Sequence, residues 1–465
     1  MKKRMRMLAS LALAGTMVLS MAACGGKSDD AAAKKDDAKT EQAEETPEGK
    51  VLNIWCWNDE FQQRFNGYYP EVKEVAEDKS TTTLNDGTVV KWTINPNENN
   101  NYQNKLDTAL QAQASAAEDD KIDIFLIEAD YALKYVDADA NVAEPLADLG
   151  ITDDDLADQY QYTKDIVTDD NGAQRGTSWQ ATPGLFAYRR SIAKDVLGTD
   201  DPEKVQEKLK DWDNFNKVAD EASKKGYKML SGYDDSYRTF SNNVSAKWVD
   251  GTTVKVDPNL MTWVDQTKTF TDKGYNNKTS LWDESWNSDQ GAKGKVFGFF
   301  YSTWGINFTL AGNAGEEGKG DWAVCEGPQP YFWGGTWICA AQGNDNPKTI
   351  KDVMLKLTCD KEIEKKITKD TQDYTNTISG MQEFADDPKF GSEFLGGQNH
   401  IKLFSEVAPQ IDMSKTSPYD QGCNEEFQAA FKGYFDGTAD MDTAKKEFET
   451  AIIEKYPELT AVEWP

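Results

Sequence analysis

The chain alternates short apolar runs with amphipathic stretches, and this alternation constrains the fold more than any other feature. VLNIWCW (51–57) has the pattern of a strand, and Phe61 and Phe65 lie four residues apart on the helix expected after it. Residues 102–116 are expected to form a second helix, and IDIFLI (122–127) is a continuous apolar run, as in a strand buried on both faces. This order of strands and helices predicts an α/β fold with parallel strands.

Later segments continue the mixed pattern. Asp-Asn-Gly within 169–172 indicates a hairpin turn, and Asp213 is expected to cap a helix. Residues 320–342 have the pattern of a strand, a Pro-rich crossing and a second strand. The last hundred or so residues are expected to be mostly helical. Two packed helices are indicated there by spaced apolar residues, Phe427, Phe431 and Tyr434 on one and Ala444, Phe448 and Ile452 on the other.

The size and charge of the chain limit its organisation and its partners. Beyond the N-terminal segment about 415 residues remain, which exceed a single core and predict two lobes. The formal net charge is −29 at pH 7. Such a surface repels nucleic acid and anionic lipid, so a neutral or cationic ligand is favoured and a nucleic-acid partner is not expected.

The N-terminus has the layout of an export signal. Four basic residues precede an apolar stretch that is short for a membrane span, and the stretch ends at Ala-Ala-Cys-Gly. This ending resembles a bacterial lipoprotein signal, which implies a signal peptide over 1–23 and a lipidated Cys24. An ordinary secretory signal with a chance cysteine is the alternative. Residues 24–49 contain no aromatic residue, so we expect a disordered tether that anchors the protein at the extracellular face of the cytoplasmic membrane.

Little in the chain suggests catalysis. His400 is the single histidine, and no metal-binding motif of His or paired Cys is present. The five cysteines after Cys24 are odd in number and widely scattered, so we expect buried thiols. We expect no enzyme activity, no catalytic residue, no cofactor and no metal. A glycosidase stays open as an alternative, because the chain has 80 Asp and Glu residues.

Tryptophans at strand ends or in Gly-rich turns are the strongest functional signal. Indole rings stack on the apolar faces of sugars, while carboxylate and amide groups bind the hydroxyls. Each of these tryptophans could instead belong to the core, and Asn58 or Asp59 could simply cap a helix. Trp212 and Trp322 are assigned to packing. The candidate stacking residues are Trp57, Trp179, Trp304, Trp333 and Trp337, with Gly335 allowing close approach of the backbone.

The order and spacing of several stretches resemble the extracellular solute-binding lipoproteins of carbohydrate ABC importers, the family that includes maltose-binding protein. The match covers nearly the whole chain after the tether. The resembling stretches are LNIWCWND, YQNKLDTAL, DIFLIEADYALKY, TPGLFAYRRSIAKDVLG, DWDNFNKVA, FYSTWGIN, GDWAVCEGPQPYFWGG and NPKTIKDVMLKL. The resemblance implies the two-lobed periplasmic-binding-protein-like fold of type II, with a hinge between the lobes. It implies an N-terminal lobe of 50–177 plus 330–372 and a C-terminal lobe of 178–329 plus 373–465.

The resemblance also implies the binding residues. Trp304 matches a stacking aromatic of the second lobe, and Gln180 lies where maltose binders carry an acidic contact. The other implied contacts are Asn58, Asp59, Glu60, Glu128, Asp130, Asp235, Tyr237, Gln398 and Asp420. Parallel α/β sheets bind ligands at the carboxyl ends of their strands, which accounts for the polar cluster after Trp57.

The resemblance implies a function and its partners. A monomer would capture a carbohydrate, here an oligosaccharide, and deliver it to separate permease subunits. Its only membrane attachment would be the lipid anchor. A binder of another solute, such as a peptide or a polyamine, is the main alternative.

Overall fold

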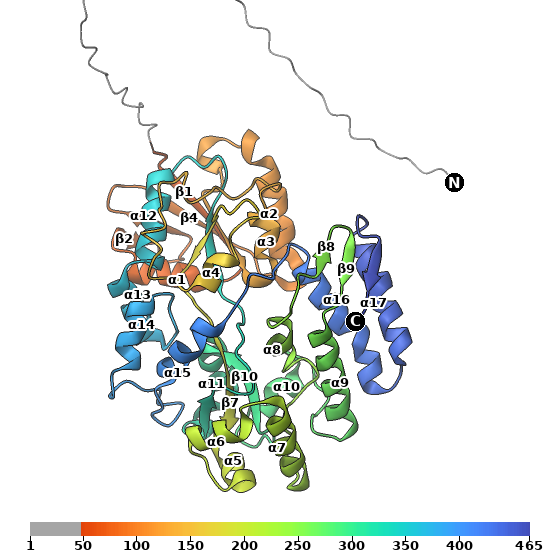
Figure 1. Ribbon diagram of the computed structural model, residues 1–465. Helices are drawn as coiled ribbons and strands as arrows, with labels where there is room; N and C mark the ends of the chain where they lie inside the picture. Colours follow the sequence, from red (N-terminus) through yellow and green to blue (C-terminus); the bar gives the residue numbers. More distant parts are fainter. Residues whose placement is uncertain (1–47) are drawn as a thin grey trace, which may run out of the picture. The chain divides into compact units, whose positions relative to one another are not determined.

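The computed structural model describes residues 48–465, which contain a seven-stranded sheet and two three-stranded sheets (Figure 1). The large sheet has the order β2-β3-β4-β1-β5-β12-β6. Its central strand β1 runs parallel to β4 and β5, with Ile54 opposite Ile124, so the predicted parallel α/β arrangement is confirmed. The strands are β1 (Val51–Cys56), β2 (Val72–Val75), β3 (Thr81–Leu84), β4 (Val89–Ile94), β5 (Ile124–Glu128), β6 (Thr177–Ser178) and β12 (Thr336–Ala340).

Helices cover both faces of this sheet. On one face, Leu52 and Ile54 of β1 are fully buried in one core cluster with Phe61 and Phe65 of α1. Burial of each such side chain contributes about 1.5–3 kcal/mol to folding, and this favours the alternating pattern seen in the sequence. The helices of this region are α1 (Glu60–Tyr68), α2 (Asn101–Ala112), α3 (Ala132–Val136), α4 (Gln161–Asp165), α12 (Pro347–Thr358) and α13 (Lys361–Thr371).

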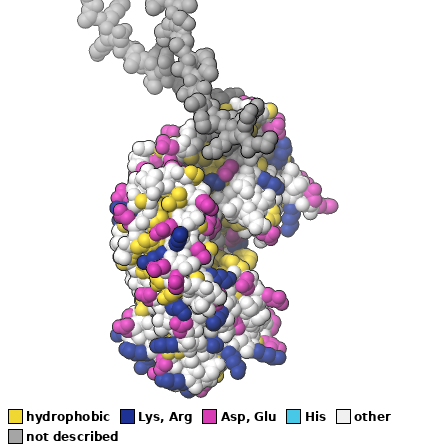
Figure 2. Space-filling model, turned by 90° about the vertical axis from the view of Figure 1, so that its right-hand side faces the viewer, with side chains coloured by type: hydrophobic (Ala, Val, Ile, Leu, Met, Phe, Trp, Pro, Cys, Tyr) yellow, Lys and Arg dark blue, Asp and Glu magenta, His cyan; other side chains and the backbone are white. Residues whose placement is uncertain are grey.

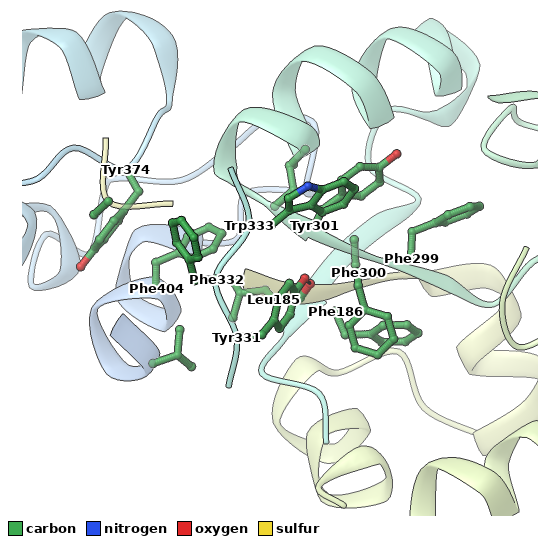
Figure 3. Packing of buried hydrophobic residues seen from close by; sticks show 14 of the residues in the cluster. Leu185, Phe186, Phe299, Phe300, Tyr301, Tyr331, Phe332, Trp333, Tyr374 and Phe404 are labelled. Carbon is green, nitrogen blue, oxygen red and sulfur yellow. Dashed lines mark hydrogen bonds between the residues drawn. The ribbon is translucent and has the colours of Figure 1, made fainter. Parts of the chain in front are cut away.

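The second sheet has the order β10-β7-β11 and is antiparallel throughout. Its strands β7 (Gly184–Arg189), β10 (Gly298–Ser302) and β11 (Trp322–Cys325) are buried along their whole length, and Trp322 lies in the core as expected. Figure 3 shows side chains of β7 and β10 packed together in this core. The surrounding helices are α5 (Arg190–Leu197), α6 (Pro202–Leu209), α7 (Trp212–Lys224), α10 (Glu284–Asp289) and α11 (Ala311–Gly318).

The C-terminal region is helical, as the sequence indicates. Phe427, Phe431, Phe448 and Ile452 are buried where α16 packs against α17, so the predicted helix pair is confirmed. The helices that share this core cluster are α8 (Tyr237–Ser241), α9 (Pro258–Asp272), α16 (Asp420–Asp436) and α17 (Met441–Lys455), while α14 (Ile378–Ala385) and α15 (His400–Val407) pack in the larger cluster around the second sheet. A small sheet of β8 (Val249–Asp250), β9 (Thr253–Lys255) and β13 (Ala461–Glu463) lies beside them (Figure 1).

Two segments connect the two larger sheets, and a third segment, which joins α13 to α14, lies beside them. The three segments are residues 179–183, 326–335 and 372–376. Ala181 N–H donates to the carbonyl of Tyr374 at 3.2 Å, and Trp333 N–H donates to the carbonyl of Thr182 at 3.2 Å. Because the crossing segments are hydrogen-bonded to one another, they limit the positions at which the two α/β lobes could rotate against each other.

Two local expectations need correction. Asp211, not Asp213, caps α7: its side chain accepts a hydrogen bond from Asn214 N–H at 2.8 Å, because the helix begins two residues earlier than expected. Glu48 and Gly49 were assigned to the tether, but Glu48 accepts from Lys348 N–H at 3.0 Å and so holds the start of α12. The expectations for the signal peptide, for Cys24 and for the rest of the tether lie outside the described residues.

The surface of the described residues carries charges of both signs. Figure 2 shows acidic and basic side chains intermixed over the face drawn, with hydrophobic side chains gathered in a hollow between its upper and lower halves. No helix within residues 48–465 is both long enough and apolar enough to cross a bilayer.

Candidate ligand-binding cleft

A cavity of about 410 Å³ opens where β1 and β5 end, and we call it the cleft. Its residues come from the ends of the seven-stranded sheet, from the crossing segments, and from the segments before and after β10. They are Trp57, Asn58, Asp59, Glu60, Gln63, Glu128, Asp130, Gln180, Arg238, Trp282, Trp304, Phe308, Trp333, Gly334, Gly335 and Thr336. The structure thus brings together ten of the sixteen ligand contacts expected from the sequence.

One wall is polar and is built on the first turn of α1. Asn58 Oδ1 accepts a hydrogen bond from Glu60 N–H at 3.1 Å, so part of its role is to satisfy the start of the helix. Gln180 Nε2 donates to Glu60 Oε1 at 3.0 Å and to Asp373 Oδ2 at 3.1 Å. Burial raises the pKa of Glu60 to about 7, because the charged form loses its hydration, although Arg64 nearby opposes the shift. This wall therefore offers both acceptors and a carboxyl that is partly protonated near neutral pH.

A second polar group follows β5. Glu128 accepts a hydrogen bond from Asp130 N–H at 2.7 Å, and Asp130 in turn pairs with Arg238 of α8 through both carboxylate oxygens at 2.7 and 2.6 Å. Burial, and then the Asp130 charge, raise the pKa of Glu128 to about 8. The Arg238 guanidinium lies 5.3 Å from the centre of the Trp333 ring, within cation–π range. The arginine thus joins the polar and aromatic sides of the cleft.

Another part of the cleft lining is aromatic. Trp333 stacks on Tyr301 with ring centres 5.9 Å apart and planes 5° from parallel, as Figure 3 shows. Trp304 donates from Nε1 to the carbonyl of Trp333 at 3.0 Å, which fixes its ring against the neighbouring indole. Trp57 meets Tyr102 and Tyr131 edge-on. These contacts hold three half-buried or buried indoles rigidly around the same cavity.

Gly334 and Gly335 let the backbone follow the aromatic wall. Their φ angles are +74° and +104°, a region that residues with a side chain rarely adopt. A Cβ on Gly334 would lie 2.9 Å from Trp304 Nε1, and one on Gly335 would lie 3.1 Å from Thr182 Oγ1. The two glycines therefore allow the crossing strand to pass directly behind the Trp304 ring.

Two expected tryptophans lie outside the cleft. Trp179 is 1% exposed and stacks on Phe61 with centroids 5.4 Å apart. Trp337 is fully buried, and its Nε1 donates to the carbonyl of Thr163 at 2.8 Å. Both side chains therefore belong to the core and not to the cleft.

Two expected polar contacts instead support turns and strands. Asp235 accepts hydrogen bonds from the backbone N–H of Ser231 and Gly232 and from Trp286 Nε1. Gln398 pairs through its amide with both the N–H and the carbonyl of Val324 on β11. Neither side chain lines the cleft.

The last two expected contacts, Tyr237 and Asp420, line a separate cavity of about 190 Å³. Tyr237 donates to Asn424 Oδ1 at 2.6 Å, and Asp420 accepts from Ser417. This second cavity shares only Asp130 and Arg238 with the cleft. The ion pair therefore forms the wall between them.

The sequence reasoning missed several lining residues. Arg238 follows Tyr237 directly in the sequence. Which of the two side chains faces the cleft depends on how the short helix α8 is rotated about its axis. Phe308 lies four residues after Trp304, a spacing that places both on one side of the helical segment between them. Trp282 stands in a short acidic stretch that resembles an ordinary surface loop. The helical spacing from Trp304 was the one signal that could have identified Phe308.

Nothing in the described part of the chain forms a metal site: residues 48–465 hold no group of three or more His, Cys, Asp or Glu side chains placed to bind an ion. His400 is buried, and its Nε2 lies 3.0 Å from the carbonyl of Gln372. The five described cysteines are free thiols.

Known structures share this architecture. An extracellular solute-binding protein of family 1 superposes with a TM-score of 0.70 at 18% identity, covering 87% of this chain and 99% of that one. An ABC transporter associated binding protein from B. animalis subsp. lactis, in complex with β-1,6-galactobiose, gives 0.65 at 16% identity over 89% and 100%. The galacto-N-biose-/lacto-N-biose I-binding protein from Bifidobacterium longum, in complex with lacto-N-biose, gives 0.64 at 13% over 90% and 100%. At these identities the likeness concerns the fold, and it agrees with the two-lobed type II architecture.

A family model also matches the sequence itself. The model describes a bacterial extracellular solute-binding protein and covers residues 74–392, which is more than half of the chain. No curated relative matches the sequence. On the family match and the shared architecture, the chain belongs to the bacterial extracellular solute-binding proteins.

Proposed function

We propose that this protein is a lipid-anchored solute-binding protein that captures an oligosaccharide in the cleft and delivers it to an ABC transporter permease. The observation that carries the proposal is a single cavity lined both by the indoles of Trp304 and Trp333 and by carboxyl and amide groups. A sugar ring has apolar C–H faces and a rim of hydroxyls, so it would satisfy both walls at once.

The protonation of the polar wall favours a neutral ligand over a polyamine. The raised pKa values of Glu60 and Glu128 reduce the negative charge of the cleft near neutral pH, and Arg238 offsets the charge of Asp130. A partly protonated carboxyl both donates and accepts hydrogen bonds, as sugar hydroxyls require. The sugars bound by the two similar bifidobacterial structures support the same ligand class.

Capture would be coupled to closure of the two lobes. We assign 50–177 plus 330–372 to the N-terminal lobe and 178–329 plus 373–465 to the C-terminal lobe. The three crossing segments would serve as the hinge. A ligand that touches Glu60 on one side and Trp304 on the other stabilises the closed arrangement by its differential affinity for that state.

Delivery would take place at the membrane surface. A monomer with a signal peptide over 1–23, a lipid on Cys24 and a tether after it would stay at the extracellular face of the cytoplasmic membrane and reach separate permease subunits. Radiolabelled palmitate incorporation into the wild-type chain, and its loss in Cys24→Ala, would test the anchor. Incorporation that persists in the variant would exclude lipidation at this cysteine.

The ligand class is tested by calorimetric titration of the full chain against α-linked gluco-oligosaccharides, β-linked galacto-oligosaccharides, spermidine and a tripeptide. Saturable heat from a sugar that is recovered intact is the expected result. Heat from spermidine or the peptide alone would overturn the carbohydrate assignment. Recovery of cleaved sugar would instead indicate a surface glycosidase.

A further inference from the structure

The outer edge of the cleft carries two large apolar side chains in contact with solvent. Trp282 is 53% exposed and Phe308 is 65% exposed, the highest values among the large hydrophobic residues of the described chain. Both line the cleft, whereas Val75, Ile94 and Ile378, the other exposed large hydrophobics described, do not. Exposed aromatic surface at the mouth of a polar cavity indicates a surface that is covered when a ligand is bound.

The backbone at Trp282 has a strained conformation, and this conformation sets the orientation of the indole ring. Its φ of +73° is rarely adopted by a bulky residue. The neighbouring chain holds the conformation: Leu281 N–H lies 3.4 Å from Asp234 Oδ2, and Asn287 Nδ2 lies 3.4 Å from the Trp282 carbonyl. Strain of this kind persists only where the surroundings impose it, and it concentrates at binding sites.

The Trp282 ring extends the aromatic wall outwards. Its centroid lies 6.2 Å from that of Trp304 with planes 23° apart, and 5.9 Å from that of Trp333. A separation of 6.2 Å is at the wide end of the range for stacked rings, so the two indoles are offset and each leaves part of a face uncovered.

Phe308 lines the same cavity. It lies on the π-helical segment Gly305–Leu310, four residues after Trp304. Insertions of this type occur often at functional sites. The Trp282, Trp304 and Trp333 rings thus form one cluster, with centroid separations of 5.4–6.2 Å, and Phe308 lines the same cavity.

We propose that Trp282 and Phe308 form an outer subsite that binds the apolar face of a second sugar ring, while the half-buried Trp304 holds the first. This inference rests on the proposed carbohydrate function. It makes Trp282 and Phe308 determinants of ligand length: they distinguish ligands of two or more rings from monosaccharides and leave binding of the first ring unchanged.

The test compares monosaccharides with oligosaccharides of two to five rings, α-1,4-linked glucose and β-1,6-linked galactose, by calorimetry on the full chain. Trp282→Ala should weaken binding of the oligomers about tenfold and of the monosaccharide less than twofold. Trp282→Gly, which removes the ring and relieves the positive φ, should show the same loss. Phe308→Ala should reproduce the pattern with a smaller change.

The matched control is Ile378→Ala, which removes an exposed apolar side chain outside the cleft and should change no affinity. Equal losses for mono- and oligosaccharides in Trp282→Ala would mean that the ring only supports the inner wall, and would overturn the outer subsite. Unchanged affinities would overturn it as well. Failure of the wild-type protein to bind any sugar would instead reject the proposed function on which the subsite depends.

Discussion

Asp130 and Arg238 form a two-pronged ion pair across the wall that separates the cleft from the second cavity, with N–O distances of 2.7 and 2.6 Å. Asp130 follows β5, which lies between β1 and β12 in the seven-stranded sheet, and Arg238 lies on α8, which packs against α9. The pair therefore links the seven-stranded sheet to the C-terminal helical group beside the cleft. Its planar, double hydrogen-bonded geometry is the stronger form of an arginine–carboxylate contact.

A double-mutant cycle measures the strength of this link. Asp130→Asn, Arg238→Met and the combined variant should give a coupling of about 1–2 kcal/mol in urea unfolding, because the pair is partly screened by solvent. Asp170→Asn and Lys247→Met provide a control cycle at an exposed pair 3.4 Å apart, which should couple by less than about 0.5 kcal/mol. Additive effects at Asp130 and Arg238 would show that the pair does not hold the two elements together.

Stability should depend on pH through the buried carboxyls of the cleft. The pKa of Glu60 is raised from 4.5 to about 7 and that of Glu128 from 4.5 to about 8, in both cases chiefly by burial. The folded protein therefore keeps protons that the unfolded chain releases, so the free energy of unfolding falls as the pH rises from about 5 to about 8.

Replacing one of these carboxyls should flatten the profile. Glu60→Gln should raise the free energy of unfolding at pH 8 relative to wild type by roughly 1–3 kcal/mol and change it little at pH 5. Glu118→Gln, at a side chain that is 70% exposed, is the control. A Glu60→Gln protein with the same pH slope as wild type would contradict the raised pKa.

Substitution of Trp333 should mainly lower the stability of the protein, whereas substitution of Trp304 should mainly weaken ligand binding. Trp333 is buried on Tyr301, so Trp333→Ala should lower the free energy of unfolding by about 3–5 kcal/mol. Trp304 is only half-buried, so Trp304→Ala should cost less stability and weaken ligand binding by about tenfold or more. Chemical unfolding and calorimetry on both variants check this. Equal stability losses would mean that Trp304 is a core residue.

Replacing Gly335 by alanine should destabilise the protein more than the same replacement at a glycine that also has a positive φ but has no atoms close to it. Gly335→Ala adds a Cβ at 3.1 Å from Thr182 Oγ1 to an unfavourable φ, whereas Gly437 has φ +76° and nothing within 4 Å. Gly437→Ala should therefore cost about 1 kcal/mol, and Gly335→Ala roughly 1–2 kcal/mol more. Urea unfolding of the two variants is the measurement, and equal costs would argue against close packing of the crossing strand.

Elements with a strong hydrophobic period could be predicted from the sequence. The alternating apolar residues in 51–57 and the continuous apolar run in 122–127 indicate which side chains are buried. Both segments form parallel strands of one sheet. The same applies to the helix pair at the C-terminus, where apolar residues recur at helical spacing. The antiparallel order of β10-β7-β11 could not be inferred, because wholly buried strands of either direction have the same composition.

Only part of the cleft could be predicted from the sequence. Polar residues directly after β1 and β5 lie in it because parallel strands end at the same edge. Trp179 and Trp304 both end or follow strands, yet one is buried on Phe61 and the other lines the cleft, a difference of side-chain direction that residue type does not reveal. Trp282 depends on a positive φ that no local motif indicates.

The most direct test of the account is a calorimetric titration of wild type and Trp304→Ala, side by side, with the oligosaccharide that gives the largest heat. We predict saturable, one-to-one binding in wild type, an intact sugar afterwards, and at least tenfold weaker binding in the variant at similar thermal stability. Undiminished affinity in Trp304→Ala would place the ligand outside the cleft and contradict the account.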